Sequence, residues 1–154
     1  MKRELRIHPI RNGTVIDHIT PGQALNVLKI LGIIGKSDAV VSAVMNVQSK
    51  KTHKKDIVKV EDRELNPHEV DKIALIAPLA TINIIRDYKV NKKDNVILPD
   101  VVEGVVRCAN PNCISNTREP VVSKFTIDKS QGKIRLRCIY CEQTIFDNIA
   151  EHLL

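Results

Sequence analysis

Residues 108–113 read Cys-Ala-Asn-Pro-Asn-Cys and residues 138–141 read Cys-Ile-Tyr-Cys, so four cysteines stand in two short-spaced pairs. Each pair is expected on a tight loop, where both sulfur atoms can point at one centre. Two such loops on neighbouring strands complete a tetrahedron of thiolates, which leaves no open position for water or substrate. The pattern therefore predicts one structural Zn²⁺ ion, held by Cys108, Cys113, Cys138 and Cys141.

Two other uses of these cysteines remain open: a pair of disulfide bonds, and an iron centre of the rubredoxin kind. The N-terminal residues MKRELRIHPIRNG contain no apolar run of a secretory signal, and the longest uncharged apolar stretch, 73–80, is too short to span a membrane. We therefore expect a cytoplasmic chain, in which thiols stay reduced and favour a metal. The four residues inside the first pair are less typical of rubredoxin than two would be.

The sequence around the cysteines predicts a small β domain over residues 104–154. Residues 124–129 and 133–138 are strand-like, and the turn residues between them indicate a hairpin. A hairpin of this size makes a poor core alone, so the metal is expected to supply the missing cohesion of a zinc-ribbon-like module. The tail, 147–154, is compatible with a short helical turn.

Charge divides the chain of 154 residues into two parts. The net charge is +6. Residues 1–95 carry 17 basic and 11 acidic side chains, whereas the remainder carries seven of each and all four cysteines. This asymmetry predicts two modules, one that attracts an anion and one that holds a metal. We place the first at 1–95, a junction at 96–103 and the second at 104–154.

The first module alternates strand and helix signals. Thr20 and Pro21 are typical of the start of one helix, and Asn66 and Pro67 of a second. Apart from an additional first strand, the order is β-α-β-β-α-β, which is typical of a ferredoxin-like antiparallel sheet with two helices on one face and gives an α+β fold class. The expected strands are 4–10, 14–19, 39–47, 56–62 and 81–90. The Val-rich segment 39–47 is either a pairing edge or a central, buried strand.

A cluster of lysines lies at residues 50–59. On a strand, Lys55 and Lys59 share one face, where they can neutralise phosphate, and Asp17 offers a carboxylate for sugar hydroxyls. The alternative without a ligand is that the lysines form a solvated loop and that His18 is a packed or surface histidine. Enzyme motifs are absent from the sequence: GIIGKSD is too short for a phosphate-binding loop, and no nucleophile elbow or metalloprotease histidine spacing occurs.

Three segments together resemble the regulatory chain of aspartate carbamoyltransferase: RNGTVIDHIT at 11–20, VDKIALIAPLATIN at 70–83, and CANPNCIS with RCIYCE at 108–115 and 137–142. The resemblance covers nearly the whole chain. It implies a non-catalytic subunit with a ferredoxin-like domain that binds CTP as inhibitor and ATP as activator of pyrimidine synthesis. It also implies a zinc domain that docks on the catalytic chain, and pairing of the N-terminal domains into a homodimer.

The resemblance also implies the positions that would meet the nucleotide. Base contacts fall near Ile10, and ribose and phosphate contacts on Asp17 and His18. Lys59 falls nearest the ribose and base, and Asn83 and Lys93 lie toward the phosphates. The full set is Ile7, His8, Ile10, Asp17, His18, Lys55, Lys59, Asn83, Ile85, Tyr88, Val90 and Lys93. The pair His8-Pro9 departs from the family's usual acidic-small pair, and Pro9 has no N–H to donate, so base preference is open.

In the second module the resemblance implies a partner interface at Asn110, Asn112 and Glu142. The alternative from another class is a zinc-ribbon nucleic-acid-binding protein. The lysines lie on the other module, while the cysteine half is neutral, which makes a nucleic-acid partner the weaker hypothesis. A stand-alone small-molecule sensor is a third reading, but it leaves the cysteines without a purpose.

Overall fold

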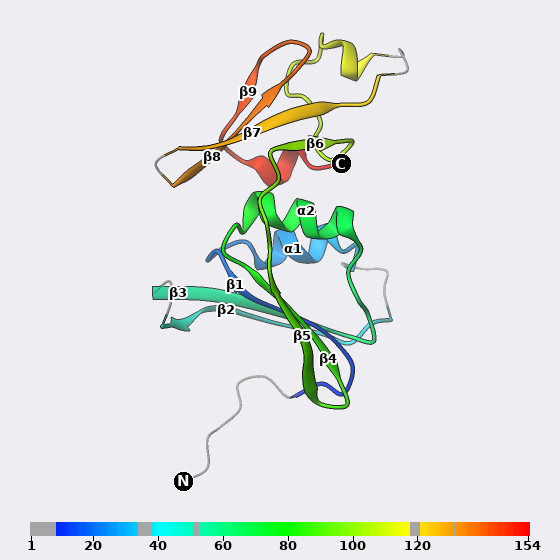
Figure 1. Ribbon diagram of the computed structural model, residues 1–154, viewed down its shortest axis with the longest axis vertical. Helices are drawn as coiled ribbons and strands as arrows, with labels where there is room; N and C mark the ends of the chain where they lie inside the picture. Colours follow the sequence, from blue (N-terminus) through cyan, green and yellow to red (C-terminus); the bar gives the residue numbers. More distant parts are fainter. Residues whose placement is uncertain (1–8, 34–37, 51–52, 118–120, 131) are drawn as a thin grey trace. The chain divides into compact units, whose positions relative to one another are not determined.

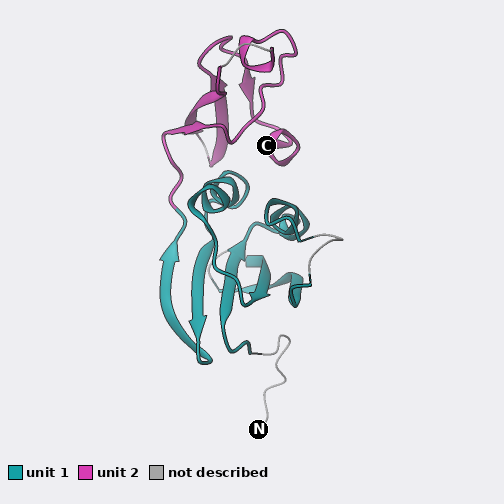
Figure 2. Cartoon of the chain, turned by 90° about the vertical axis from the view of Figure 1, so that its right-hand side faces the viewer, with its two compact units in different colours: residues 1–96 teal, residues 97–154 magenta. Residues whose placement is uncertain are grey.

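A computed structural model describes residues 9–33, 38–50, 53–117, 121–130 and 132–154. The chain divides into two compact units, residues 1–96 and 97–154 (Figure 2). Two helices and two antiparallel sheets confirm the α+β prediction. Neither helix in the described part of the chain is long and apolar enough to cross a membrane.

The first unit is a five-stranded sheet in the order β2-β3-β1-β4-β5, with every neighbouring pair antiparallel. Both helices lie on the same face of this sheet (Figure 1). The first four strands and two helices follow the ferredoxin-like order that the sequence predicts, and β5 is added beside β4. The elements are β1 (Gly13–Ile19), α1 (Ala24–Ile30), β2 (Val41–Ser49), β3 (His53–Glu61), α2 (Pro67–Ile76), β4 (Thr81–Arg86) and β5 (Lys89–Asn95).

The core of this unit is aliphatic and lies between the sheet and the helices. Ile16 of β1 and Val58 and Val60 of β3 are completely buried, as are Val27 of α1 and Ile73 of α2. Successive side chains of a strand point to opposite faces. The alternate residues of β1 and β3 therefore form the other face of the sheet, the one that the helices do not cover.

The two helices begin in different ways. At α2 the prediction holds: the Asn66 side chain accepts a hydrogen bond from the Glu69 N–H (2.9 Å) and the Glu69 carboxylate accepts one from the Asn66 N–H (3.1 Å), a complete capping box. At α1 it is wrong, because Pro21 and Gly22 lie in a turn and the helix starts after Gln23, which makes no side-chain cap. The buried Asp56 carboxylate of β3 accepts from the Ala24 N–H instead.

The predicted strand 81–90 is in fact a hairpin. Strand β4 ends at Arg86 and β5 starts at Lys89, with Arg86 paired to Lys89 across a two-residue turn. Asp87 (φ 50°) and Tyr88 (φ 65°) both adopt left-handed backbone, which is the requirement of the tight turn that matches strand twist. Two-residue turns of this kind usually contain glycine or asparagine. Because this turn contains neither, the sequence did not predict it. Strand β5 occupies residues 89–95, directly before the predicted junction at 96–103.

Strand β2 lies at the edge of the sheet, and none of its residues is buried. The alternative of a central strand is therefore wrong. A register shift between Val44 and Val47 interrupts its pairing with β3, and Asn46 at the shift has φ 57°. Of the strand predicted at 4–10, residues 4–8 lie outside the described residues, and Pro9 and Ile10 are not in a strand.

The second unit contains a four-stranded antiparallel sheet in the order β6-β7-β8-β9. The predicted hairpin is confirmed as β7 and β8, and its buried centre is formed by Phe125 and Leu136. The sequence analysis missed the two short outer strands. The elements are β6 (Val101–Glu103), η1 (Ile114–Asn116), β7 (Lys124–Ser130), β8 (Lys133–Cys138), β9 (Thr144–Ile145) and η2 (Ile149–His152), the last confirming a short helical turn in the tail.

Candidate metal centre and effector face

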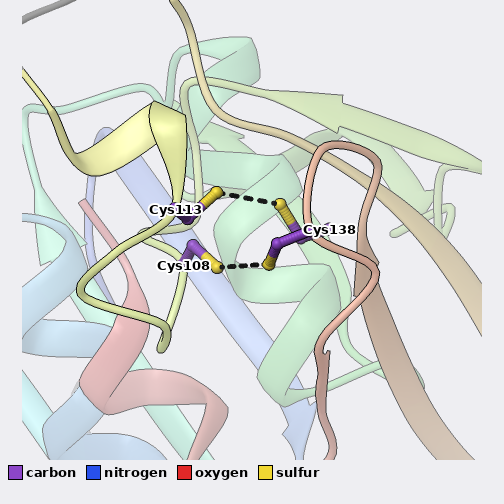
Figure 3. Close-up of side chains that lie close together, drawn as sticks. Cys108, Cys113 and Cys138 are labelled. Atoms are coloured by element: carbon purple, nitrogen blue, oxygen red, sulfur yellow. Dashed lines mark hydrogen bonds between the residues drawn. The ribbon is translucent and has the colours of Figure 1, made fainter.

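The four cysteines meet in the second unit, as their spacing predicts. Their sulfur atoms all lie within 4.8 Å of one another, and none of the four forms a disulfide bond. Cys108 Sγ is 3.5 Å from Cys141 Sγ, and Cys113 Sγ is 3.6 Å from Cys138 Sγ (Figure 3). A disulfide bond requires about 2.05 Å, so the disulfide alternative does not fit these positions.

The geometry fits a tetrahedral thiolate site. Sulfur atoms about 2.3 Å from a zinc ion at tetrahedral angles stand about 3.8 Å apart, close to the two distances in this cluster. Cys108, Cys113 and Cys138 are buried, and Cys141 is partly exposed. Cys138 comes from the end of β8, whereas Cys113 precedes η1, so the centre joins a strand to an otherwise irregular loop.

Burial dominates the electrostatics of the cluster. Desolvation raises the pKa of Cys108 to about 12 and also raises the pKa of Cys138. Burial opposes ionisation of Cys113 as well, but hydrogen bonds from the hydroxyl and main-chain N–H of Ser115, together with those from Cys138 and Cys141, outweigh it and lower the pKa of Cys113 to about 7. The Ser115 Oγ lies 3.2 Å from Cys113 Sγ. A divalent cation supplies the charge that makes buried thiolates favourable.

In the first unit, several predicted effector residues fall in one row across the sheet. Lys59 of β3 pairs with Val15 of β1, Val15 pairs with Asn83 of β4, and Asn83 pairs with Lys93 of β5. Directly paired residues share a face, and this is the face opposite the buried Val58 and Val60. We call this row the effector row. It places two ammonium groups and one amide along the side of the sheet away from the helices.

The effector row is flanked on one side by a charged pair. Lys55 Nζ lies 2.9 Å from Asp17 Oδ1, and the side chains of both residues are largely shielded from solvent. His18 has φ 56°, and its Nδ1 lies 3.3 Å from the Thr81 hydroxyl. Burial lowers the pKa of Lys59 from its ordinary value. Lys55, Lys59 and Asp17 therefore lie on one surface of the sheet, and their joint action on a nucleotide stays a prediction.

On its other side, the effector row is followed by Ile85, which pairs with Val90. Ile85 is 9% exposed and Ile10 is 7% exposed, whereas Val90 and Tyr88 present 58% and 65% of their surface. The Tyr88 N–H donates to the Arg11 carbonyl (2.9 Å), which brings the segment before β1 beside the β4–β5 turn. Of the predicted set, Ile7 and His8 lie outside the described residues.

The predicted partner-interface residues surround the cysteines. Asn112 and Glu142 are exposed and Asn110 is half-buried. The same two loops expose three large apolar side chains: Ile114 (44%), Ile139 (42%) and Tyr140 (42%).

Several residues that position these groups were not predicted from the sequence. Ser115 and Asn116 contact the first cysteine loop, Thr81 contacts His18, and Asp56 holds the start of α1. Ser115 could have been suspected, because it follows Cys113 by two residues and carries a hydroxyl. Thr81 and Asp56 are far from their partners in sequence, so only the fold reveals them.

Comparison with known proteins assigns both units. Residues 5–97 match the family described as the aspartate carbamoyltransferase regulatory chain, allosteric domain, and residues 100–151 match the metal binding domain of the same chain. These descriptions agree with a regulatory, non-catalytic chain and give no support to the nucleic-acid-binding alternative.

Curated relatives carry the same description, and this chain matches them over nearly their full length. The chain is 63% identical to the aspartate carbamoyltransferase regulatory chain of Methanothrix thermoacetophila, over 100% of this chain and 99% of the relative. It is 63% identical to that of Methanocella arvoryzae, over 99% and 98%. It is 56% identical to that of Thermofilum pendens, over 94% and 91%. The chain therefore belongs to the family of aspartate carbamoyltransferase regulatory chains.

Proposed function

We propose that this chain is the allosteric subunit of a cytoplasmic aspartate carbamoyltransferase and binds CTP and ATP on its first unit to tune pyrimidine synthesis. The observation that carries the proposal is the effector row, in which Lys59, Asn83 and Lys93 are aligned by strand pairing. The Asn83 amide donates one hydrogen to the Val15 carbonyl (3.2 Å), which leaves its second hydrogen, beside the two ammonium groups, to match a polyphosphate. The neighbouring Asp17 offers acceptors for ribose hydroxyls. The predicted base contacts near Ile10 remain part of the proposal.

The second unit is proposed to hold one structural Zn²⁺ ion and to dock on a catalytic chain. When bound, zinc cross-links the two cysteine loops without redox chemistry. Asn110, Asn112 and Glu142 then stand beside the exposed apolar side chains of Ile114, Ile139 and Tyr140. Apolar side chains ringed by polar hydrogen-bonding groups are the usual anatomy of a protein interface.

The first unit is proposed to pair with a second copy through β2. Among the described residues, no strand pairs with the outer edge of β2, and none of the residues of β2 is buried. Unpaired main-chain groups of an edge strand are a template for another strand. Sedimentation of the chain at micromolar concentration should give a dimer, and a monomer would contradict this part of the proposal.

Allosteric control then follows from linkage. A nucleotide changes catalysis only if it binds differently to two states of the assembly, and the usual coupling is about 1 to 3 kcal/mol. The chain's own residues supply the binding step in one unit and the docking step in the other.

Titration calorimetry with CTP and with ATP at fixed salt tests the effector site. We expect saturable binding to the wild-type chain, and roughly 10- to 100-fold weaker binding to Lys59→Ala, because a hydrogen bond to a charged group contributes about 1.5 to 3 kcal/mol. Lys29→Ala is the matched control, since Lys29 is exposed on α1. Equal affinity of the Lys59→Ala and wild-type chains would remove the assignment.

A further inference from the structure

The two cysteine loops of the second unit are held by different means. The Cys138–Cys141 loop is closed by the main chain: the Cys138 N–H donates to the Gln143 carbonyl (3.0 Å), and the Glu142 N–H donates to the Cys138 carbonyl (2.9 Å). Cys138 also belongs to β8 and pairs with Phe125. This loop is therefore part of the sheet.

The Cys108–Cys113 loop has weaker main-chain support. It lies outside the strands and contains four residues between its cysteines instead of two. Within it, the Cys113 N–H donates to the Asn110 carbonyl (3.1 Å), and the Asn112 N–H donates to the Asn110 side chain (3.0 Å). A longer loop outside a sheet needs another group to fix the direction of both sulfur atoms.

The side-chain amide of Asn116 contacts both halves of this loop. Asn116 Nδ2 donates to the carbonyl of Cys108 (2.9 Å) and to the carbonyl of Asn110 (2.7 Å). An amide NH₂ group has two hydrogens, and both are used here. Since the Asn110 carbonyl also accepts from Cys113, the single amide links the backbone of one ligand to the turn that carries the other.

We infer that Asn116 is the positioning residue of the metal centre: its amide holds the Cys108–Cys113 loop in the ligating geometry and thereby slows release of the ion. This inference rests on the proposed structural metal. Groups behind the ligands commonly change metal affinity by about 10- to 100-fold when they are removed. The expected effect is confined to the first loop, because the second is closed by its own main chain.

Metal release from the zinc-loaded full-length chain tests the inference. A chromogenic chelator in excess would report the release rate for the wild type, Asn116→Ala, Asn116→Asp and Asn116→Gln. We expect release about 10-fold faster for Asn116→Ala. Asn116→Asp should be faster still, because it sets a carboxylate against two carbonyl oxygens. Asn116→Gln keeps the NH₂ group and should fall between Asn116→Ala and the wild type.

The matched control is Gln143→Ala, which removes an exposed amide beside the other loop, where only the main chain is used. Release at the wild-type rate from both Asn116→Ala and Asn116→Asp would overturn the inference. If Asn116→Ala does not retain zinc on purification, Asn116→Gln decides: retention by that variant supports the inference, and loss by both overturns it. A wild-type chain that binds no zinc would instead overturn the proposed structural metal.

Discussion

The carboxylate of Asp56 accepts a hydrogen bond from the main-chain N–H of Ala24 (3.1 Å), although the two residues are 32 positions apart. The same oxygen accepts from the Gly22 N–H (3.0 Å), and the other carboxylate oxygen accepts from the Asn46 N–H (2.9 Å). Asp56 is completely buried. One side chain of β3 therefore fixes both the start of α1 and the irregular point of the edge strand β2.

Asp56→Ala is expected to lower the free energy of unfolding of the first unit by about 3 kcal/mol or more. The change leaves the buried Ala24 N–H without an acceptor, which costs about 1 to 3 kcal/mol. The part-buried N–H groups of Gly22 and Asn46 also lose their acceptor and add a smaller cost. Urea denaturation followed by circular dichroism would measure it. Asp56→Asn, which keeps one acceptor oxygen, should lose less, and a larger loss for asparagine than for alanine would contradict this explanation.

Gly13→Ala is expected to destabilise the sheet strongly. A Cβ atom at residue 13 would lie 2.2 Å from the carbonyl oxygen of Val60, and the backbone has φ 145°. The neighbouring strand would have to move, so we expect a loss of at least about 2 kcal/mol, comparable to overpacking of a core. Gly22→Ala is the control, because its Cβ would meet open space and only the φ of 92° is unfavourable. Thermal unfolding of both variants distinguishes steric conflict from backbone strain.

As the pH rises, nucleotide affinity is expected to fall at a lower pH than it would with a lysine of ordinary pKa. Burial lowers the pKa of Lys59 below 10.5. The protonated ammonium is the form that attracts phosphate, so its contribution is complete below this lowered pKa and is lost as pH rises through it. Calorimetry across alkaline pH would show the decline in the wild type. Lys59→Arg keeps its charge throughout, and a parallel decline in that variant would assign the titration to another group.

Cys113→Ser, or exhaustive chelation, is expected to unfold the second unit and to release a catalytic partner. A structural zinc site contributes on the order of 10 kcal/mol in small domains, more than a four-stranded sheet of this size can replace. Hydrogen exchange measured separately over both units should rise across residues 97–154 and stay unchanged over the first unit. A variant that still co-elutes with the catalytic chain would contradict the docking role.

The sequence predicted those features of the fold that depend on local chemistry. The capping box at Asn66, the β7–β8 hairpin and the four-cysteine centre each use residues that are close in sequence and chemically specific. Prediction failed where residues that are distant in sequence determine the local structure. The start of α1 depends on Asp56, so Thr20 and Pro21 gave a false boundary.

The β4–β5 hairpin shows a second reason for failure. Asp87 and Tyr88 adopt left-handed backbone, and the Asp87 N–H is within 3.3 Å of the Asn12 side chain. Tertiary contacts support a turn that the residue types alone do not favour. The face that carries the effector row was predictable in part, since alternation puts Lys59 on the same face as Lys55 of the flanking pair. Only the strand order places Asn83 and Lys93 in one row with Lys59.

The edge strand β2 also affects the tendency of the chain to aggregate before it binds another subunit. Its residues, Val41–Ser49, include no charged side chain and no proline, the groups that usually guard such edges. The bulge around Asn46 is the feature within this strand that interrupts straight extension. A chain synthesised in excess is thus exposed to open-ended strand addition, and aggregation at high concentration should decrease when a lysine replaces the exposed Met45.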